Sequence, residues 1–382
     1  MIKYIDQCPQ DLYSKRVVLR VDYNVPIEEG KVKDSTRILE SKKTIDYLLN
    51  LKCDIILLTH LGRPKTEEDK KKYTTRHVWK YLNESKVLSV EVDFIENFDR
   101  RISYQGGKVY LFENVRFFDG ETKNNLELAK KFAEYGDFFV NDAFGSLHRV
   151  HSSVAGISEF LPTFFGFLVK HELENLSRFL RPEQPFTLIL GGAKISDKLG
   201  LIKNIKAQNV IVGGATCLTI YKNKGKNIGQ SFFEEIDTSE IELRITMPSD
   251  FIVVDQNYQN PVARNIDHIG DGIVVDAIPN ELILEMIRQS RTIFWNGPMG
   301  IFEKGFTQGS LEILRALNQA KGFRGIGGGD TVRFFKEVTK SYPELSGAID
   351  FISTGGGATL EFLENGTLQA IEYIKNKVQT RR

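Results

Sequence analysis

The residues that could do chemistry in the first half of this sequence stand where short apolar runs end. Charged and polar side chains follow four of these runs: Asp22 and Asn24, then His60 and Arg63, then Arg116, then His148, Arg149 and His151, with Arg37 at the start of a predicted helix. A guanidinium group matches the oxygens of phosphate and carboxylate. If these ends converge, they predict a pocket for an anionic ligand, and Asp22 and Asn24 suggest that the ligand also has hydroxyl groups. The alternative is that each arginine pairs with a structural carboxylate.

In the second half, the corresponding runs end in glycines instead of charged residues. The glycine clusters are Gly191–Gly192, Gly213–Gly214, Gly297, Gly327–Gly329 and Gly355–Gly357. Missing side chains let a flat ligand lie against the backbone and expose N–H groups to phosphate oxygens. The pattern predicts a nucleotide site. Tight packing of strands against helices is the alternative, and it could explain one or two of the clusters.

Two lysines follow the first glycine pair in "GGAKISDK" (191–198). Lys194 and Lys198 are four residues apart, a spacing that places two side chains on one face of a helix. Such lysines are often solvated, but their position behind a strand and Gly191–Gly192 favours contact with phosphate oxygens.

Several common site signatures are absent. The sequence has no G-x-x-x-x-G-K-[ST] string and no G-x-G-x-x-G after a strand, which argues against a P-loop NTPase and a dinucleotide-binding dehydrogenase. It also lacks H-E-x-x-H, C-x-x-C and G-x-S-x-G strings. Of the six histidines, we interpret His77 and His171 as ordinary surface or core residues.

Alternating elements must position these groups. The apolar runs are 16–24, 54–62, 108–117 and 137–145 in the first half, and 186–192, 209–214, 291–297 and 323–329 in the second. Helix-period segments such as 35–51 and 124–135 separate them. Strands that alternate with helices predict mostly parallel sheets covered on both faces. In such sheets ligands bind beyond the carboxyl ends of the strands. We therefore expect two doubly wound α/β domains.

A connecting helix is expected between the two domains. Leu173, Leu176 and Leu180 repeat at helical spacing within 166–185, and Pro182 and Pro185 end the pattern. The chain closes with a second amphipathic helix, which has Leu368, Ile371, Ile374 and Val378 on one face.

Bulk composition sets wider limits. The chain has 382 residues, 41% hydrophobic and 26% charged, as in an ordinary globular protein of two domains. A net charge of +1 favours neither nucleic acid nor membrane as a partner. The start has no apolar core typical of a signal peptide, and the longest apolar stretch, 160–169, is about half of what a membrane span needs. Three scattered cysteines fit a reducing, cytoplasmic location.

The strings that carry these residues resemble the phosphoglycerate kinase family over nearly the whole chain. They follow the family's order: "VVLRVDYNVP" (17–26), "LLTHLGRP" (57–64), "LFENVRF" (111–117), "FVNDAFGSLHRVHSS" (139–153), "LGGAKISDKL" (190–199), "FWNGPMGIFE" (294–303), "GGGDT" (327–331) and "STGGGATLEFL" (353–363). The sequence departs from the family's pattern at Ala215 in "GGATC", at "HIGDG" (268–272), where an Asp-Ile-Gly-Pro-like string is expected, and at Phe351.

The resemblance implies a glycolytic kinase that transfers a phosphoryl group reversibly from 1,3-bisphosphoglycerate to ADP, giving 3-phosphoglycerate and ATP. It implies two Rossmann-like domains that face each other across an active-site cleft: residues 1–165 bind the phosphoglycerate, 186–360 bind the magnesium nucleotide, 166–185 form a helical hinge that bends on closure, and 361–382 return to the N-terminal domain. The family further implies a cytoplasmic monomer.

Site roles also follow from the resemblance, position by position. The acid substrate would contact Asp22, Asn24, Arg37, His60, Gly62, Arg63, Arg116, Arg149 and His151. The nucleotide would contact Gly192, Lys198, Gly213, Gly214, Asn296, Gly297, Pro298, Glu303, Gly327, Gly328, Gly329, Asp330 and Thr331. Arg37 and Lys194 would be catalytic, because they would stabilise the transferring phosphoryl group.

A carboxylate beside a phosphate-binding glycine loop, as in "IGGGDTV" (326–332), needs an explanation. Magnesium offers one, since it favours one or two carboxylates together with phosphate oxygens and water. We expect Asp330 to hold the ion, while Thr331 and the following N–H groups bind phosphate oxygens at a helix start. The alternative is that Asp330 caps a helix beginning near Thr331.

Two other classes of protein remain as alternatives. An ATP-dependent ligase that forms an acyl phosphate would need a further site for an amine or thiol, and no motif suggests one. A two-domain binding protein would close on a ligand without chemistry, and Lys194 and Asp330 argue against it.

Overall fold

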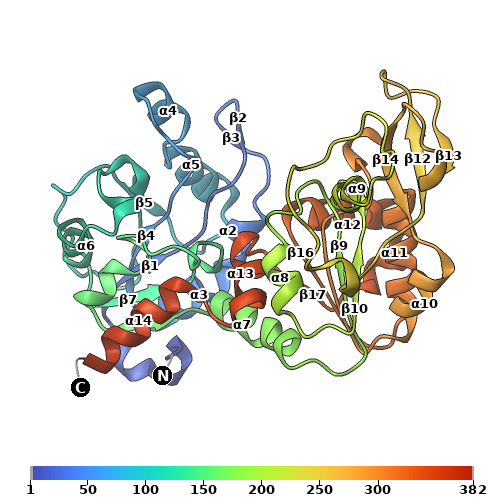
Figure 1. Ribbon diagram of the computed structural model, residues 1–382. Coiled ribbons are helices and arrows are strands. Elements are labelled where there is room, and N and C mark those ends of the chain that lie inside the picture. The colour runs from blue at the N-terminus through green and yellow to red at the C-terminus, as the bar shows by residue number, and fades with distance from the viewer. Residues whose placement is uncertain (1–2, 381–382) are drawn as a thin grey trace. The chain divides into compact units, whose positions relative to one another are not determined.

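A computed structural model describes residues 3–380 of the chain. By compactness the chain divides into two units: one comprises the residues up to Glu174 and those from Thr367 onward, and the other is Asn175–Gly366 (Figure 1). The two units are called unit 1 and unit 2. Each unit is built around one six-stranded parallel sheet, so the expected fold class, two parallel α/β domains, is confirmed.

The sheet of unit 1 has the strand order β5-β6-β4-β1-β7-β8. Its strands are β1 (Arg16–Arg20), β4 (Asp54–Leu58), β5 (Val92–Ile95), β6 (Val109–Phe112), β7 (Phe138–Asn141) and β8 (Thr163–Phe165). Alternate residues of the central strands belong to different cores: Val17 and Leu19 pack on one face, and Val18 packs on the other. Burial on both faces explains why these strands are continuous apolar runs in the sequence.

Helices cover both faces of this sheet (Figure 1). They are α1 (Pro9–Leu12), α2 (Thr36–Glu40), α3 (Lys42–Asn50), α5 (Arg76–Ser85) and α6 (Leu126–Ala133). A further helix, α4 (Glu67–Lys72), has no buried residue and does not cover the sheet. The segment 35–51, expected as one helical segment, is two helices that meet at Ser41. A small hairpin of β2 (Ile27–Glu28) and β3 (Lys31–Val32) lies outside the main sheet.

Two further helices contribute to unit 1, one at the division between the units and one near the C-terminus. The helix expected within 166–185 is present as α7 (Phe167–Leu180), and the division between the units falls inside it. The final helix, α14 (Gln369–Thr380), packs on unit 1: the N–H of Ala370 donates to the carbonyl of Leu147, and the hydroxyl of Tyr373 donates to Glu159. Leu368, Ile371 and Ile374 are buried as expected, whereas the side chain of Val378 lies outside the described residues.

The sheet of unit 2 has the strand order β11-β10-β9-β15-β16-β17. Its strands are β9 (Phe186–Leu190), β10 (Asn209–Val212), β11 (Ile245–Thr246), β15 (Thr292–Asn296), β16 (Phe323–Gly327) and β17 (Phe351–Ile352). The helices of the unit are α8 (Leu199–Asn204), α9 (Gly214–Asn223), α10 (Glu281–Gln289), α11 (Gln308–Gln319), α12 (Gly329–Ser341) and α13 (Gly357–Asn365). The four strands expected here are therefore adjacent members of one sheet.

Unit 2 also contains a second, antiparallel sheet that the sequence did not predict. Its order is β13-β12-β14, with β12 (Asp250–Val254) paired to both β13 (Val262–Asn265) and β14 (Ile273–Ile278). β13 is largely exposed, so it lacks the apolar pattern of a buried strand. Among residues 3–380, no helix is both long and apolar enough to cross a membrane.

Candidate active site

The polar residues expected to bind an anion gather at the carboxyl edge of the unit 1 sheet. Asp22 and Asn24 follow β1, His60 to Arg63 follow β4, Arg116 lies in a short 3-10 helix after β6, and Arg149 and His151 follow β7. Because β6, β4, β1 and β7 are neighbours in the sheet, their carboxyl ends lie side by side.

Hydrogen bonds join these residues into a frame. Nη1 of Arg37, on α2, lies 3.1 Å from Oδ2 of Asp22 and donates to the carbonyl of Asn24 at 3.3 Å. Oδ1 of Asn24 accepts the N–H of Gly62 at 2.9 Å, and Nη1 of Arg116 donates to the carbonyl of Gly62 at 2.5 Å. Gly62 is thus held between residues of two other strand ends. The frame fixes the backbone on which Arg63 stands.

Most of the arginines have no carboxylate partner. Arg37 pairs with Asp22, but Arg63, Arg116 and Arg149 make no salt bridge to any residue within 3–380. Nε of Arg116 is buried and has no hydrogen-bond partner in that same part of the chain. The alternative of structural ion pairs therefore applies to Arg37 alone. A buried guanidinium edge without a partner is costly, and an anionic ligand would satisfy it.

The histidines lie in a strongly positive environment. Burial first, and then the charges of Arg20, Arg116, Arg149 and Arg37, hold the pKa of His60 well below its ordinary value. Burial and the charges of Arg20, Arg116, Arg149 and His148 lower the pKa of His151 to about 4. Burial and the neighbouring Arg149 also lower the pKa of Arg116 to about 10. Because their pKa values are lowered, the imidazoles of His60 and His151 are neutral at pH 7 in the free protein.

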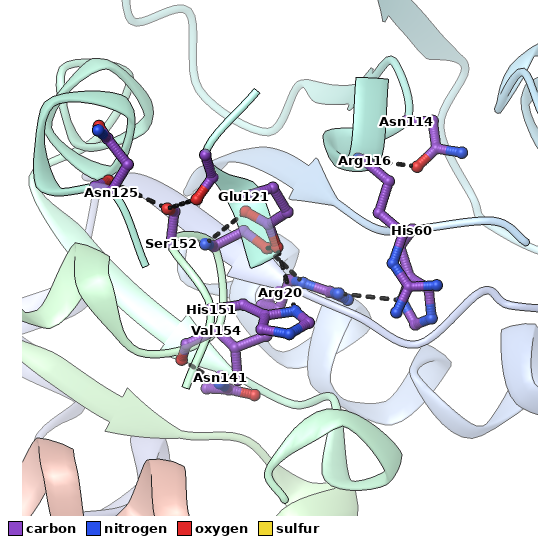
Figure 2. A network of polar contacts seen from close by, with 12 residues as sticks. Arg20, His60, Asn114, Arg116, Glu121, Asn125, Asn141, His151, Ser152 and Val154 are labelled. Carbon is purple, nitrogen blue, oxygen red and sulfur yellow. Dashed lines mark hydrogen bonds and ion pairs between the residues drawn. The ribbon is translucent and has the colours of Figure 1, made fainter. Parts of the chain in front are cut away.

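Behind these strand-end residues lies a buried network that the sequence interpretation missed. Figure 2 shows Arg20 between Glu121 and His60. Nη2 of Arg20 lies 3.1 Å from Nδ1 of His60, and its Nε donates to Oγ of Ser153 at 3.0 Å. The carboxylate of Glu121 accepts the N–H and hydroxyl of Ser153 at 3.0 and 2.6 Å. Arg20 and Glu121 are almost completely buried. A charged residue at the end of an otherwise apolar strand was the available signal for Arg20.

The expected glycine clusters of unit 2 lie at the carboxyl edge of β10, β9, β15 and β16, but they serve two purposes. A Cβ on Gly191 would lie 2.3 Å from the carbonyl oxygen of Pro298, and Gly297 has a φ of +93°. These positions are glycine because two loops of the protein touch through their backbones, as the packing alternative proposed. A Cβ on Gly329, by contrast, would meet nothing within 4 Å. In the Gly327–Gly329 loop only Gly329 is therefore open to a ligand, since a Cβ on Gly328 would lie 2.7 Å from Nδ2 of Asn296.

A cavity of about 590 Å³ lies beside these loops. Five of the expected nucleotide residues line it: Gly192, Gly214, Pro298, Glu303 and Asp330. Residues missed by the sequence interpretation also line it, among them Phe232, Tyr258, Met299 and Asp276, which comes from the unpredicted strand β14. Apolar walls with a few polar groups are typical of a small-molecule pocket.

The three departures from the family pattern lie in different places relative to the cavity. Ala215 lines the cavity directly, whereas residues 268–272 form a turn and Phe351 is buried in β17. A string of the Asp-x-x-Pro form does begin at the cavity wall, with Asp276 lining the cavity and Pro279 three residues later. We therefore correct the placement of this string from 268–272 to 276–279.

The expected helical pairing of Lys194 and Lys198 is wrong. Lys198 is the residue before α8, and Lys194 lies in the turn that precedes it. The turn closes because the N–H of Lys198 donates to the carbonyl of Ile195 at 2.8 Å, and Nζ of Lys198 donates to the carbonyl of Lys194 at 2.7 Å. Lys198 is buried, and burial lowers its pKa against the opposing charges of Asp197, Glu234 and Asp330. Lys194 is exposed.

The loop around Asp330 also differs from expectation in one detail. Helix α12 begins at Gly329, its N-cap is Gly328, and Asp330 lies in its first turn without capping it. The hydroxyl of Thr331 is buried and accepts the N–H of Gly297 at 2.6 Å, so it ties two loops together. Asn296 packs against Gly328 behind the same loop. Within residues 3–380 no three His, Cys, Asp or Glu side chains form a metal cluster.

Comparison with known proteins identifies the same family. The family model described as phosphoglycerate kinase matches residues 5–366. A curated relative from Finegoldia magna, named phosphoglycerate kinase, is 39% identical and aligns over 95% of this chain and 97% of its own length. A relative of that name from Thermus thermophilus is 38% identical over 96% of this chain and 98% of its own.

Solved structures agree in fold. The structure of phosphoglycerate kinase from Coxiella burnetii superposes with a TM-score of 0.83 at 33% identity, covering 96% of this chain and 97% of that one. The crystal structure of phosphoglycerate kinase from Pyrococcus horikoshii gives 0.81 at 27% identity, covering 99% of this chain and 100% of that one. The family model and the relatives span both units, and the chain therefore belongs to the phosphoglycerate kinase family.

Proposed function

We propose that the chain catalyses magnesium-dependent phosphoryl transfer between 1,3-bisphosphoglycerate and ADP, with phosphoglycerate bound by unit 1 and nucleotide by unit 2. The family is one of phosphotransferases that act in glycolysis. The observation that supports the division of labour most strongly is the group of arginines at the unit 1 strand ends. Arg63, Arg116 and Arg149 lack carboxylate partners among residues 3–380, and the site therefore has unneutralised positive charge where an acid substrate would bind.

Substrate contacts in unit 1 follow from this arrangement. The guanidinium groups would bind the phosphate and carboxylate oxygens of phosphoglycerate, and Asp22 and Asn24 would bind its hydroxyl group. The low pKa of His60 and His151 keeps both imidazoles neutral, so they suit hydrogen bonding more than proton transfer. Proton transfer is also unnecessary, because the carboxylate acceptor is already ionised at pH 7, given a pKa near about 4.

The nucleotide contacts belong to the cavity of unit 2. Its walls would hold the base, Glu303 would reach the ribose, and Lys198 would reach the phosphates with the N–H groups of Gly327–Thr331. The side chain of Thr331 would act indirectly, by holding Gly297 in place. Gly213 and Asn296 would shape the loops from behind.

The residues present fit a magnesium ion bound with the nucleotide. Asp330 is one exposed carboxylate at the cavity, and magnesium typically takes one or two carboxylates with phosphate oxygens and water. A protein cluster of several acids is not required for this kind of site. The ion would supply neutralisation of phosphate charge, and Asp330 would hold it.

Catalysis would then depend on positioning the two substrates and on neutralising the negative charge of the transferring phosphoryl group. Arg37 is oriented by Asp22, and Lys194 is exposed at the edge of the nucleotide loops. We propose that both stabilise the transferring phosphoryl group. The two ligands must meet with water excluded, so we also propose that the hinge at α7 closes the units during turnover. Small-angle scattering with both ligands should then show compaction, and unchanged scattering would contradict closure.

We further propose that the enzyme acts as a cytoplasmic monomer on small molecules, and not on nucleic acid or membranes. Support comes from the net charge of +1 and from the three cysteines, which are all free thiols.

The decisive test of function is turnover. ATP should be consumed with 3-phosphoglycerate, in an assay coupled to reduction of the acyl-phosphate product. A chelator of magnesium should stop the reaction, and added magnesium should restore it. Purified protein that shows no turnover with this pair of substrates would contradict the proposal.

A further inference from the structure

The turn that contains Lys194 donates hydrogen bonds to the carboxylate of Glu234, a residue outside the expected site. Glu234 lies in the segment between α9 and β12. Its side chain accepts hydrogen bonds from the N–H of Ile195 at 2.5 Å, the N–H of Ser196 at 3.1 Å and the hydroxyl of Ser196 at 2.7 Å. Three donors from two consecutive residues thus converge on one side chain.

The charge of this carboxylate is favoured by its surroundings. Burial opposes ionisation, but the hydrogen bonds from Ser196 and Ile195 and the charge of Lys194 prevail and lower the pKa of Glu234. Glu234 therefore remains an anion at neutral pH. Hydrogen bonds to an ionised acceptor are stronger than neutral ones.

Both ends of this connection are anchored. The N–H of Glu234 donates to Oγ1 of Thr219, a buried residue of α9. On the other side, Ile195 is fully buried, and its carbonyl accepts the N–H groups of Lys198 and Leu199 as α8 begins. The turn is thereby connected to α9 through Glu234 and to α8 through its own backbone.

Lys194 depends on this backbone for its position. Its ammonium group makes no hydrogen bond or salt bridge to any residue in the described part of the chain, so its position is set mainly by the backbone that carries it. Its carbonyl is held by Lys198, and the next residue, Ile195, is held by Glu234.

We infer that Glu234 is a positioning residue for phosphoryl transfer: its carboxylate fixes the turn 194–196 so that Lys194 faces the transferring group. The inference rests on the proposed catalytic role of Lys194. Misplacement of a catalytic group by about 1 Å can cost on the order of a hundredfold in rate. Loss of Glu234 should therefore lower the rate of phosphoryl transfer. It should leave the binding of phosphoglycerate by unit 1 unchanged.

The test compares Glu234→Gln with Glu235→Gln, alone and combined with Lys194→Ala. Gln keeps the size of Glu234 but loses its charge and one acceptor oxygen. Glu235 is the adjacent exposed acid and provides the matched control. Glu234→Gln should lower kcat roughly tenfold or more, with KM for 3-phosphoglycerate unchanged within about twofold. Glu235→Gln should leave both constants unchanged.

A double-mutant cycle separates positioning from general structural damage. In the Lys194→Ala background, Glu234→Gln should lower kcat by less than about twofold, because the residue it positions is gone. A full additional loss in that background would overturn the inference.

Amide hydrogen exchange provides a readout that does not depend on catalysis. The N–H groups of Ile195 and Ser196 should exchange faster in Glu234→Gln and unchanged in Glu235→Gln. Unchanged exchange, or an unchanged kcat in Glu234→Gln while Lys194→Ala is impaired, overturns the inference but leaves the proposed function intact. An unimpaired Lys194→Ala variant contradicts the proposed role of Lys194 and the inference with it.

Discussion

Nη2 of Arg20 lies 3.1 Å from Nδ1 of His60. A guanidinium group can only donate hydrogen bonds, so Nδ1 of His60 must accept, and the neutral imidazole has its proton on Nε2. His60 is therefore held in the tautomer that offers an N–H donor away from Arg20. Arg20 is itself buried and opposite Glu121, whose charge it partly balances (Figure 2).

The first prediction concerns the charge state of these histidines. Burial and surrounding arginines lower the pKa of His60 and His151 in the free protein. Bound 3-phosphoglycerate would add negative charge beside them, so we expect both pKa values to rise on binding, with proton uptake below about pH 6.5. NMR titration of the imidazole resonances with and without ligand measures this. His268, exposed in unit 2, is the internal control.

The same prediction applies to kinetics: a plot of rate against pH should show no change near pH 7 that is due to titration of His60 or His151. His151→Gln should keep the shape of the profile while weakening substrate binding. A near-neutral limb that disappears in His60→Gln or His151→Gln would show that these residues transfer protons.

The second prediction concerns an arginine without a carboxylate partner. Arg149→Ala should raise KM for 3-phosphoglycerate roughly tenfold to a hundredfold, since a hydrogen bond to a charged group contributes about 1.5–3 kcal/mol. KM for ATP should not change, because Arg149 belongs to unit 1. Arg101→Ala, at an exposed position of the same unit, is the control. Equal changes in both KM values would argue against a substrate contact.

Sequence patterns predicted the four central strands of each parallel sheet, together with the residues at their ends. Parallel strands such as β1 and β4 are continuous apolar runs, and their parallel pairing places Asp22 and His60 at one edge of the sheet. The antiparallel β13 escaped prediction because its side chains are mostly exposed, so burial left no period in the sequence.

The parts of the site that were missed depend on contacts between distant residues. Glu121 meets Ser153 across 32 positions of sequence, and Glu234 meets Ile195 across 39. Nothing in the local pattern distinguishes these acids from surface ones. The helical spacing of Lys194 and Lys198 misled for the same reason, because a carboxylate from elsewhere holds that segment as a turn.

The third prediction concerns the buried carboxyl of Asp142. Burial raises its pKa to about 7, against hydrogen bonds from Thr44 and the N–H of Val169. The folded state thus keeps a proton that the unfolded state releases above about pH 4. The contribution of this group to stability is present at low pH and is lost as pH rises toward 7, by at most about 1.4 kcal/mol per pH unit.

Asp142→Asn removes this titration while it retains an acceptor for Val169. The free energy of unfolding of the native protein, minus that of the variant, should fall between about pH 4 and pH 7 and then level off. Urea unfolding at several pH values measures the difference. A difference that stays constant with pH would mean that the pKa of Asp142 is not raised in the folded state.

The fourth prediction separates the two roles considered for Asp330. Gly328 is the N-cap of α12, and Asp330 makes no capping hydrogen bond there. Its remaining contribution to the helix is the favourable position of a negative charge in the first turn, worth about 0.3–1 kcal/mol. Asp330→Asn should therefore lower the melting temperature only slightly.

The magnesium concentration needed for half-maximal kcat should rise roughly tenfold or more in Asp330→Asn, because one hard anionic ligand is lost. Asp197→Asn, at an exposed acid in the turn before α8, is the control. A large loss of stability with an unchanged magnesium requirement would assign Asp330 to the helix and not to the metal.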